Sequence, residues 1–310
     1  MTTIGFVLLT HSHPGQVLNL SRVLSELYGD PPIVCHHDFS QCPLSKNRFP
    51  ANVRFVEPYF RTFWGCFSIV PAARAAIRLL MDCDRAPDWF YLLSGSDYPI
   101  ASPERVLDTL ADTPYDAFID YREIAWRPRL QQPLATPKSG FSRSGYPALA
   151  YRRYCAVAIP RPSKNQPFVI PPVGHSYLYH PLWRTIVPGP FSEEFRCYAG
   201  EHWFTANRKA AQVLLTDTGR ATRLLAHLRT RESPEECFYH TLLGNARLKL
   251  STNNLRYIDW ASPEAFHPRW LTVNDMDQIE SSDAHFARKL APGSPLAAEL
   301  DRMLGVKQAA

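Results

Sequence analysis

Two adjacent carboxylates, Glu235 and Glu236, have the clearest chemical potential in this sequence of 310 residues. They follow Ser233 and Pro234 and precede an apolar run, in the stretch SPEECFYHTLLGN. Ser and Pro in these positions are typical of a helix start, and Glu236 would then complete a capping box with Ser233. The same carboxylate could act as a general base, because the positive end of a helix favours its ionised form. The local sequence leaves both interpretations open.

Polar residues also follow three short apolar runs. The run Trp89–Leu93 leads into Ser-Gly-Ser-Asp, the first apolar run leads into Thr-His-Ser-His-Pro-Gly, and the second leads into His-His-Asp. In an open α/β sheet, ligands bind outside the carboxyl ends of the strands, where such residues would lie. Gly, Ser, Asp and Pro are also what plain turns are made of. A ligand site and a turn therefore both remain open at residues 94–97.

The sequence does not indicate a metal site. Cys35-His36-His37-Asp38 has metal-binding side chains, but adjacent residues on a strand point to opposite faces and no second ligand cluster follows. The two Asp-x-Asp sequences, at residues 82–84 and 275–277, fall at an expected helix end and in an expected first helical turn. We therefore expect neither a metal nor a resident cofactor.

Short apolar strands alternate with amphipathic helices over the first 120 residues, a pattern that predicts crossover units and a mostly parallel sheet. The same pattern resumes after residue 195 and ends in a last helical stretch that finishes with AHFARKL, residues 284–290. The predicted fold class is thus α/β, a Rossmann-related, mostly parallel sheet flanked by helices. The expected strands cover residues 4–10, 31–38, 52–57, 88–100, 115–121, 196–207 and 254–260, and the expected helices cover 14–29, 68–83, 102–112, 207–229 and 233–244.

Residues 121–195 interrupt this rhythm as a Pro-rich insertion. Between Arg122 and Lys164 there are nine Lys or Arg residues and one acid, Glu123. Such a charge excess is typical of a solvated surface, and it would also suit a wall facing an anionic acceptor or a membrane surface. No nucleic-acid-binding motif accompanies it. We predict one domain over 1–310, with a nucleotide-binding half (1–120), this basic insertion (121–195) and a C-terminal catalytic region (196–310).

Composition points to a globular protein that is soluble. Hydrophobic residues make up 45% of the chain and charged residues 20%, and no apolar run approaches the length of a membrane-spanning helix. The seven cysteines are scattered and form no Cys-x-x-Cys pair, which favours reduced thiols. The sequence therefore predicts a cytoplasmic location, with at most peripheral contact at the inner membrane face.

Five motifs occur in an order that resembles one enzyme family. They are WGCFSI (64–69), DWFYLLSGSDYPI (88–100), GEHWFTANR (200–208), SPEECFYHTLLGN (233–245) and HPRWLT…HFARKL (267–290). Together, over roughly residues 4–290, they resemble the core-2/I-branching N-acetylglucosaminyltransferases and the related peptide xylosyltransferases. The resemblance implies a GT-A-like fold, a UDP-sugar donor bound without a metal, and inversion at the anomeric carbon.

The resemblance also implies a role for each motif. Glu236 is the implied catalytic base, and Glu235 stands beside it at the substrate. Arg269 and Lys289 are the implied clamp on the diphosphate, with Arg288 as a further candidate. Other implied donor contacts are His37 and Asp38 at the uridine, together with Trp64, Gly65, Ser94, Gly95, Ser96 and Asp97; Glu201, His202 and Trp203 would meet the acceptor or the transferred sugar.

The sequence thus predicts an inverting glycosyltransferase of polysaccharide biosynthesis. It would move a sugar, with GlcNAc as the first choice, from UDP to a hydroxyl of a neutral or anionic glycan or glycoconjugate in a β-linkage. Two alternatives stay open: a UDP-xylose-dependent transferase, and a non-catalytic module that binds glycans or membrane surfaces. The family's eukaryotic members carry an N-terminal membrane anchor that this sequence lacks, so we expect a soluble, bacterial-type member.

Overall fold

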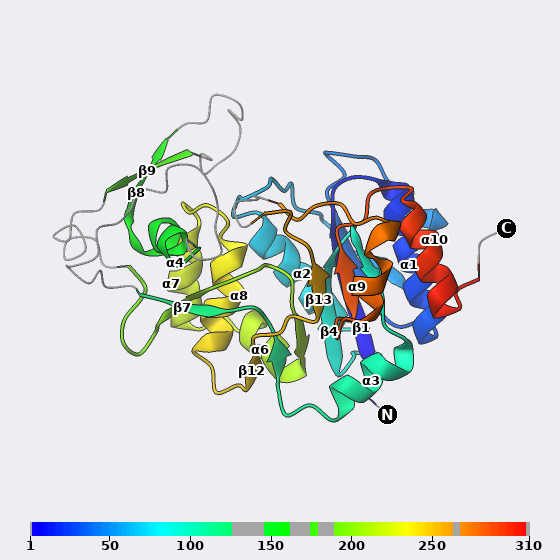
Figure 1. Cartoon of the computed structure of the whole chain (residues 1–310). Coiled ribbons are helices and arrows are strands. Elements are labelled where there is room, and N and C mark those ends of the chain that lie inside the picture. Colours follow the sequence, from blue (N-terminus) through cyan, green and yellow to red (C-terminus); the bar gives the residue numbers. More distant parts are fainter. Residues whose placement is uncertain (1, 126–145, 162–173, 179–188, 263–266, 308–310) are drawn as a thin grey trace.

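A seven-stranded sheet organises the part of the chain that the computed structural model describes, residues 2–125, 146–161, 174–178, 189–262 and 267–307 (Figure 1). The strand order is β12-β6-β11-β4-β1-β2-β3, and every pair is parallel except those that β11 makes with β4 and β6. The predicted fold class, a mostly parallel sheet flanked by helices, is confirmed. The strands are β1 (Ile4–Thr10), β2 (Ile33–His37), β3 (Val53–Phe55), β4 (Trp89–Ser94), β6 (Ala117–Phe118), β11 (Thr205–Asn207) and β12 (Leu250–Ser251).

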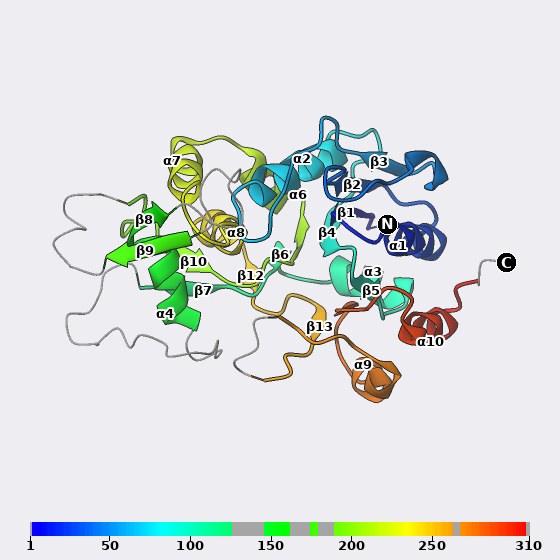
Figure 2. The same cartoon turned by 90° about the horizontal axis from the view of Figure 1, so that it is seen from above.

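The central strands read as continuous apolar runs because both of their faces are covered. Val7 and Leu92 point into one core with helices α2 (Ile69–Met81), α6 (Arg208–Leu215), α7 (Gly219–Leu228) and α8 (Glu235–Gly244). Phe6 and Leu93 point into a second core with α1 (Pro14–Tyr28), α3 (Pro103–Ala111) and α10 (Pro295–Leu304). Figure 2 shows α2 and α6 on the opposite side of the sheet from α3 and α10.

The C-terminal region differs from the prediction. Its expected helical stretch through residue 290 is wrong, because residues 286–288 form strand β14 (Phe286–Arg288). This strand pairs in parallel with β13 (Arg256–Ile258) and antiparallel with β5 (Asp97–Pro99), which sets Arg288 opposite Asp97. All three residues of β14 are buried, so its sequence has no polar face from which a strand period could be read. The helices of this region are α9 (Met276–Glu280) and α10.

The start of α8 also differs from the expected capping box. Ser233 has a positive φ of 46°, Pro234 is the N-cap, and no side chain caps the helix. The backbone N–H of Ser233 donates to the carbonyl of Gly65 (2.9 Å), and the Tyr154 hydroxyl donates to the carbonyl of Ser233 (2.7 Å). Ser233 thus anchors the helix start to two other segments through its backbone, and the capping box is absent.

Part of the predicted insertion lies at the α7–α8 end of the molecule (Figure 1). It contains β7 (Arg122–Ile124), paired with β10 (Cys197–Ala199), helix α4 (Tyr146–Ala150), a π-helical turn (Tyr151–Cys155) and the antiparallel strands β8 (Val157–Arg161) and β9 (Gly174–Leu178). Most of its predicted basic wall, including residues 126–145 and 162–173, lies outside the described residues. No helix in the described ranges is long and apolar enough to cross a bilayer.

Candidate active site

A cavity of about 440 Å³ opens at the carboxyl edge of the central sheet. Thr10 and His11 reach it from the end of β1, His36 from β2, and Ser94 and Ser96 from the end of β4. The carboxyl ends of parallel strands meet at one edge, so these segments converge there although they lie far apart in the sequence. The cavity therefore lies where the sequence predicted a ligand.

Residues 201–203 reach the same edge because of the antiparallel strand. β11 runs against β4, so its amino end lies beside the carboxyl end of β4, and Glu201, His202 and Trp203 line the cavity just before it. The loop is tied to α8, since the backbone N–H of Gly200 donates to the carbonyl of Glu236 (3.0 Å). A side chain at Gly200 would put its Cβ 1.7 Å from the Asp120 carbonyl oxygen, so this approach requires glycine.

His202 contributes a neutral ring to the cavity wall. Its ring stacks between those of Trp203 and Tyr239, with centroid distances of 4.4 and 5.6 Å. Burial lowers the pKa of His202 to about 3, and the nearby Arg288 charge acts in the same direction. His202 is therefore uncharged at neutral pH, and its buried Nε2 has no hydrogen-bond partner in the described part of the chain.

The two acids at the start of α8 both line the cavity, but they differ in exposure and in hydrogen-bond partners. Glu235 is 6% exposed, and burial together with the neighbouring Glu236 charge raises its pKa to about 8. Its Oε2 has no hydrogen-bond partner among the described residues. Glu236 keeps 27% of its side chain exposed and forms an ion pair with Arg153 at 3.0 Å. Burial raises the pKa of Glu236 as well, and Arg153 opposes that rise. Burial thus acts against the ionised form that the helix end would favour.

Two adjacent cations, Arg288 and Lys289, line the same cavity as these acids. Arg288 is 8% exposed, and its guanidinium lies 4.7 Å from the ring centroid of Trp203. Its Nε and Nη1 have no hydrogen-bond partner in the described ranges. Burial lowers the pKa of Arg288, and the carboxylates of Asp97 and Glu201 counteract this. The site therefore holds a buried positive group whose donors are available to an anionic ligand.

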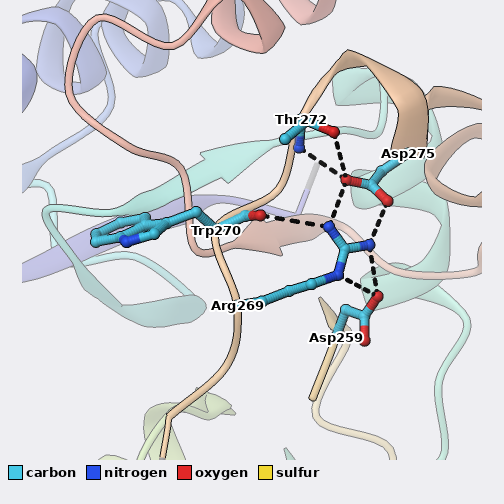
Figure 3. A network of polar contacts seen from close by, with 5 residues as sticks. All are labelled: Asp259, Arg269, Trp270, Thr272 and Asp275. Atoms are coloured by element: carbon cyan, nitrogen blue, oxygen red, sulfur yellow. Dashed lines mark hydrogen bonds and ion pairs between the residues drawn. The ribbon is translucent and has the colours of Figure 1, made fainter. Parts of the chain in front are cut away.

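Arg269, the other implied clamp residue, is not part of the cavity lining. Figure 3 shows its guanidinium between two carboxylates, with Nε donating to Asp259 (2.8 Å) and Nη1 donating to Asp275 (3.0 Å). Asp275 also accepts from the backbone N–H of Thr272 (2.7 Å). The predicted contact of Arg269 with the diphosphate does not fit this geometry, because its charge is already balanced by two acids. Arg288, and not Arg269, lines the cavity beside Lys289.

Substitution of Arg269 tests this reassignment. Arg269→Gln should leave UDP affinity unchanged and lower the melting temperature by about 2–4 °C, because Asp275 loses its charged partner in a partly exposed network. Isothermal titration with UDP and a thermal melt measure the two effects. Arg105→Gln, which removes an exposed pair with Asp283, is the matched control for loss of an arginine ion pair. A tenfold or larger loss of UDP affinity in Arg269→Gln would restore the original assignment.

His37 and Asp38, the implied uridine contacts, form hydrogen bonds that hold the loop beside the cavity. His37 is buried, with Nδ1 2.8 Å from the Thr10 hydroxyl and Nε2 2.7 Å from the Cys42 carbonyl. Asp38 accepts from the backbone N–H groups of Ser40 and Thr62; although burial opposes them, these and further hydrogen bonds lower its pKa to about 2. Neither residue lines the cavity, so direct uridine contact is not supported. Their neighbours His36, Gln41 and Thr62 do line it.

Some of the remaining residues implied to contact the donor line the cavity, and others do not. Trp64 lines the cavity and is 68% exposed, and Ser94 and Ser96 also line it. Gly65, Gly95 and Asp97 do not line it. Asp97 is buried and accepts from the backbone N–H of Ser94 (2.6 Å), so it closes the turn after β4. Asp97 therefore fits the turn interpretation, while Ser94 and Ser96 line the cavity in which a ligand is predicted.

Several lining residues escaped the sequence analysis. Trp260 and His267 line the cavity, and the buried Nε1 of Trp260 has no hydrogen-bond partner within the described segments. His267 and Pro268 belong to the motif that was read for Arg269, so that motif marked the right segment and the wrong side chain. Arg153 lies in the insertion, where no local pattern singled it out. The two Asp-x-Asp sequences contribute no side chain to the cavity.

More than half of the chain matches one known protein family. A model described as Core-2/I-Branching enzyme matches residues 35–143 and 172–280. The chain belongs to the core-2/I-branching enzyme family. The family predicted from the five motifs is thereby confirmed, and the matched ranges include the acid pair, Glu201–Trp203 and Arg269, and end before Arg288 and Lys289.

Among curated proteins, this family member is similar to two from Arabidopsis thaliana. It is 25% identical to beta-glucuronosyltransferase GlcAT14B over 97% of its own length and 66% of that protein, and 26% identical to GlcAT14A over 69% and 42%. It therefore spans less than two thirds of one and less than half of the other. A solved structure of the galactosyltransferase LgtC with donor and acceptor sugar analogs matches at 9% identity with a TM-score of 0.36, covering 98% of this chain and 97% of that one.

Proposed function

We propose that this protein is an inverting glycosyltransferase that uses a UDP-sugar and needs no metal. The observation that supports this most is the convergence of an acid pair, Glu235 and Glu236, and a cation pair, Arg288 and Lys289, on one cavity at the sheet edge. Transfer from a sugar nucleotide requires a base for the acceptor hydroxyl and positive charge for the departing diphosphate. Family membership supports the same reaction class.

In the proposed reaction, the acceptor hydroxyl gives its proton to Glu236 as its oxygen bonds to the anomeric carbon. The bond from that carbon to the diphosphate oxygen breaks on the opposite face, and UDP leaves with the electron pair, so the configuration inverts. Arg288 can donate hydrogen bonds to two phosphate oxygens with its planar guanidinium, while Lys289 acts as a point charge. Glu235, which keeps its proton at neutral pH, can donate a hydrogen bond to a sugar oxygen.

The sugar itself has two candidates. The motif resemblance favours GlcNAc, while both Arabidopsis relatives are named glucuronosyltransferases. One observation favours a glucuronosyl donor for this chain: Arg288 is stacked on Trp203, in the segment expected to meet the transferred sugar, and has two donors without a partner in the described residues. A sugar carboxylate would satisfy those donors. The cytoplasmic location and a glycan acceptor remain predictions.

A donor panel tests the proposal. The purified protein is incubated with UDP-GlcNAc, UDP-glucuronate or UDP-xylose, with oligosaccharide acceptors, and UDP release is measured with and without EDTA. We expect turnover with one donor and no change on chelation. Loss of activity in EDTA that Mn²⁺ restores would contradict the metal-free site. Absence of both turnover and a UDP-induced thermal shift would favour the non-catalytic module.

A further inference from the structure

The segment Tyr146–Cys155 of the insertion is fixed against the start of α8. Besides the bond from Tyr154 to Ser233, Nη1 of Arg231 donates to the carbonyls of Arg153 (3.2 Å) and Ala156 (2.6 Å). The ring Nε2 of His227 lies 2.7 Å from the carbonyl of Tyr154. These contacts come from α7, from the loop after it and from the turn before α8, so this part of the insertion has a defined position beside the acid pair.

Two side chains of this segment reach the proposed base. Nη1 of Arg153 donates to Oε2 of Glu236 at 3.0 Å, and the Tyr146 hydroxyl lies 3.4 Å from the same oxygen. Arg153 is 9% exposed, and its Nε lies 3.8 Å from a carboxylate oxygen of Glu232. A buried charge-assisted hydrogen bond of this kind fixes both the rotamer and the ionised form of its acceptor.

We propose that Arg153 is a positioning residue for catalysis: its ion pair keeps Glu236 ionised and directs the carboxylate at the acceptor hydroxyl. This inference rests on the proposed function, in which Glu236 is the base. It gives the insertion a role in the reaction through residues 146–155, separate from any role of the basic stretches outside the described residues.

The surroundings of Glu236 make Arg153 the decisive neighbour. Burial favours the protonated form, and Arg153 is the largest influence that opposes it, followed by the hydrogen bond from Tyr146. Other charged or titratable groups belong to the same part of the molecule. Glu232, Glu235 and Cys237 are neighbours of Glu236 along the chain, Tyr154 lies in the insertion, and Glu201, His202, Arg288 and Lys289 line the same cavity.

The sign of the expected effect follows from this balance. Without Arg153, the pKa of Glu236 rises further, so the base is protonated over more of the acidic range. The acid limb of the kcat/KM profile of Arg153→Gln should therefore move to higher pH. Relative to the unmodified protein, kcat/KM should fall roughly tenfold or more at pH 6 and recover progressively towards pH 8.5. A purely structural role would lower kcat/KM by the same factor at every pH.

Two further variants keep the experiment decisive. Arg153→Lys retains the charge and should restore most of the normal pH profile, even if Arg153→Gln folds poorly. Arg74→Gln removes another arginine ion pair, with Asp217, neither of whose residues lines the cavity, and should leave the profile unchanged. An unshifted acid limb in Arg153→Gln, or the same shift in Arg74→Gln, would overturn the inference. Near-normal activity of Glu236→Gln would instead overturn the proposed base itself, so the two failures are distinguishable.

Discussion

Glu236→Gln is expected to lower kcat by roughly 10²- to 10⁴-fold while the protein still folds and binds UDP. The amide has nearly the same shape as the carboxylate and can still accept a hydrogen bond from Arg153, but it cannot take the acceptor proton. In the proposed reaction the UDP moiety interacts with the cation pair and not with this side chain, so UDP affinity should change little. Steady-state kinetics, UDP titration and a thermal melt measure the three quantities.

The neighbouring acid provides the matched comparison. The pKa of Glu235 is raised to about 8, so its side chain is largely protonated and neutral at pH 7. A neutral amide therefore has the same charge at that pH. Glu235→Gln should accordingly cost far less than Glu236→Gln at pH 7. Comparable losses in both variants would mean that the two acids act as a unit. Near-normal transfer by Glu236→Gln would leave both with a structural role at the helix start.

Arg288→Met is expected to reduce kcat/KM by roughly 10²- to 10³-fold, the usual cost of removing one charged group that stabilises a developing anion. Methionine is about as long as the aliphatic part of Arg288 and can pack on Trp203, so the variant removes the charge with limited loss of packing. The pairing of β14 with β5 provides the backbone support at this position. Initial rates with the active donor measure the effect, and Arg288→Lys should be intermediate.

The ligand that loses affinity identifies the group that Arg288 binds. If Arg288 holds the diphosphate, Arg288→Met will weaken UDP more than UMP. If it holds the carboxylate of a glucuronosyl group, UDP affinity will persist and only UDP-glucuronate will bind less well. An unchanged affinity for all of these ligands, with unchanged rates, would remove Arg288 from the site.

Most of the fold was predictable because its central strands are buried on both faces and most of its helices on one. β1 and β4 read as nearly continuous apolar runs, β2 begins with one (Ile33–Cys35), and α2 shows apolar residues at helical spacing. Their types and approximate bounds therefore follow from these patterns. β14 was misread because three buried residues carry no period. The α8 start was misread because Ser233 bonds to Gly65, a contact between residues 168 positions apart in the sequence.

The candidate site was predictable in its segments more than in its side chains. The motifs marked the correct strand ends and loops, and Glu201–Trp203, Glu235, Glu236, Arg288 and Lys289 all line the cavity. Which member of a motif faces the cavity depends on partners elsewhere in the chain. Arg269 points at Asp259 and Asp275, and Asp38 points at its own loop. Arg153 meets Glu236 only through tertiary packing, and no spacing rule links residues 83 positions apart.

The pairing of β5 with β14 joins residue 97 to residue 288, so the segment that carries Arg288 and Lys289 is held in place by a contact between distant parts of the polypeptide. A nascent chain that has emerged only as far as α8 contains the proposed base but not yet the cation pair proposed to bind the diphosphate. Long-range pairings of this kind form slowly because a large loop must first close. Nucleotide capture should therefore be among the last properties acquired during refolding, and its appearance can serve as a signal that the entire sheet edge has assembled.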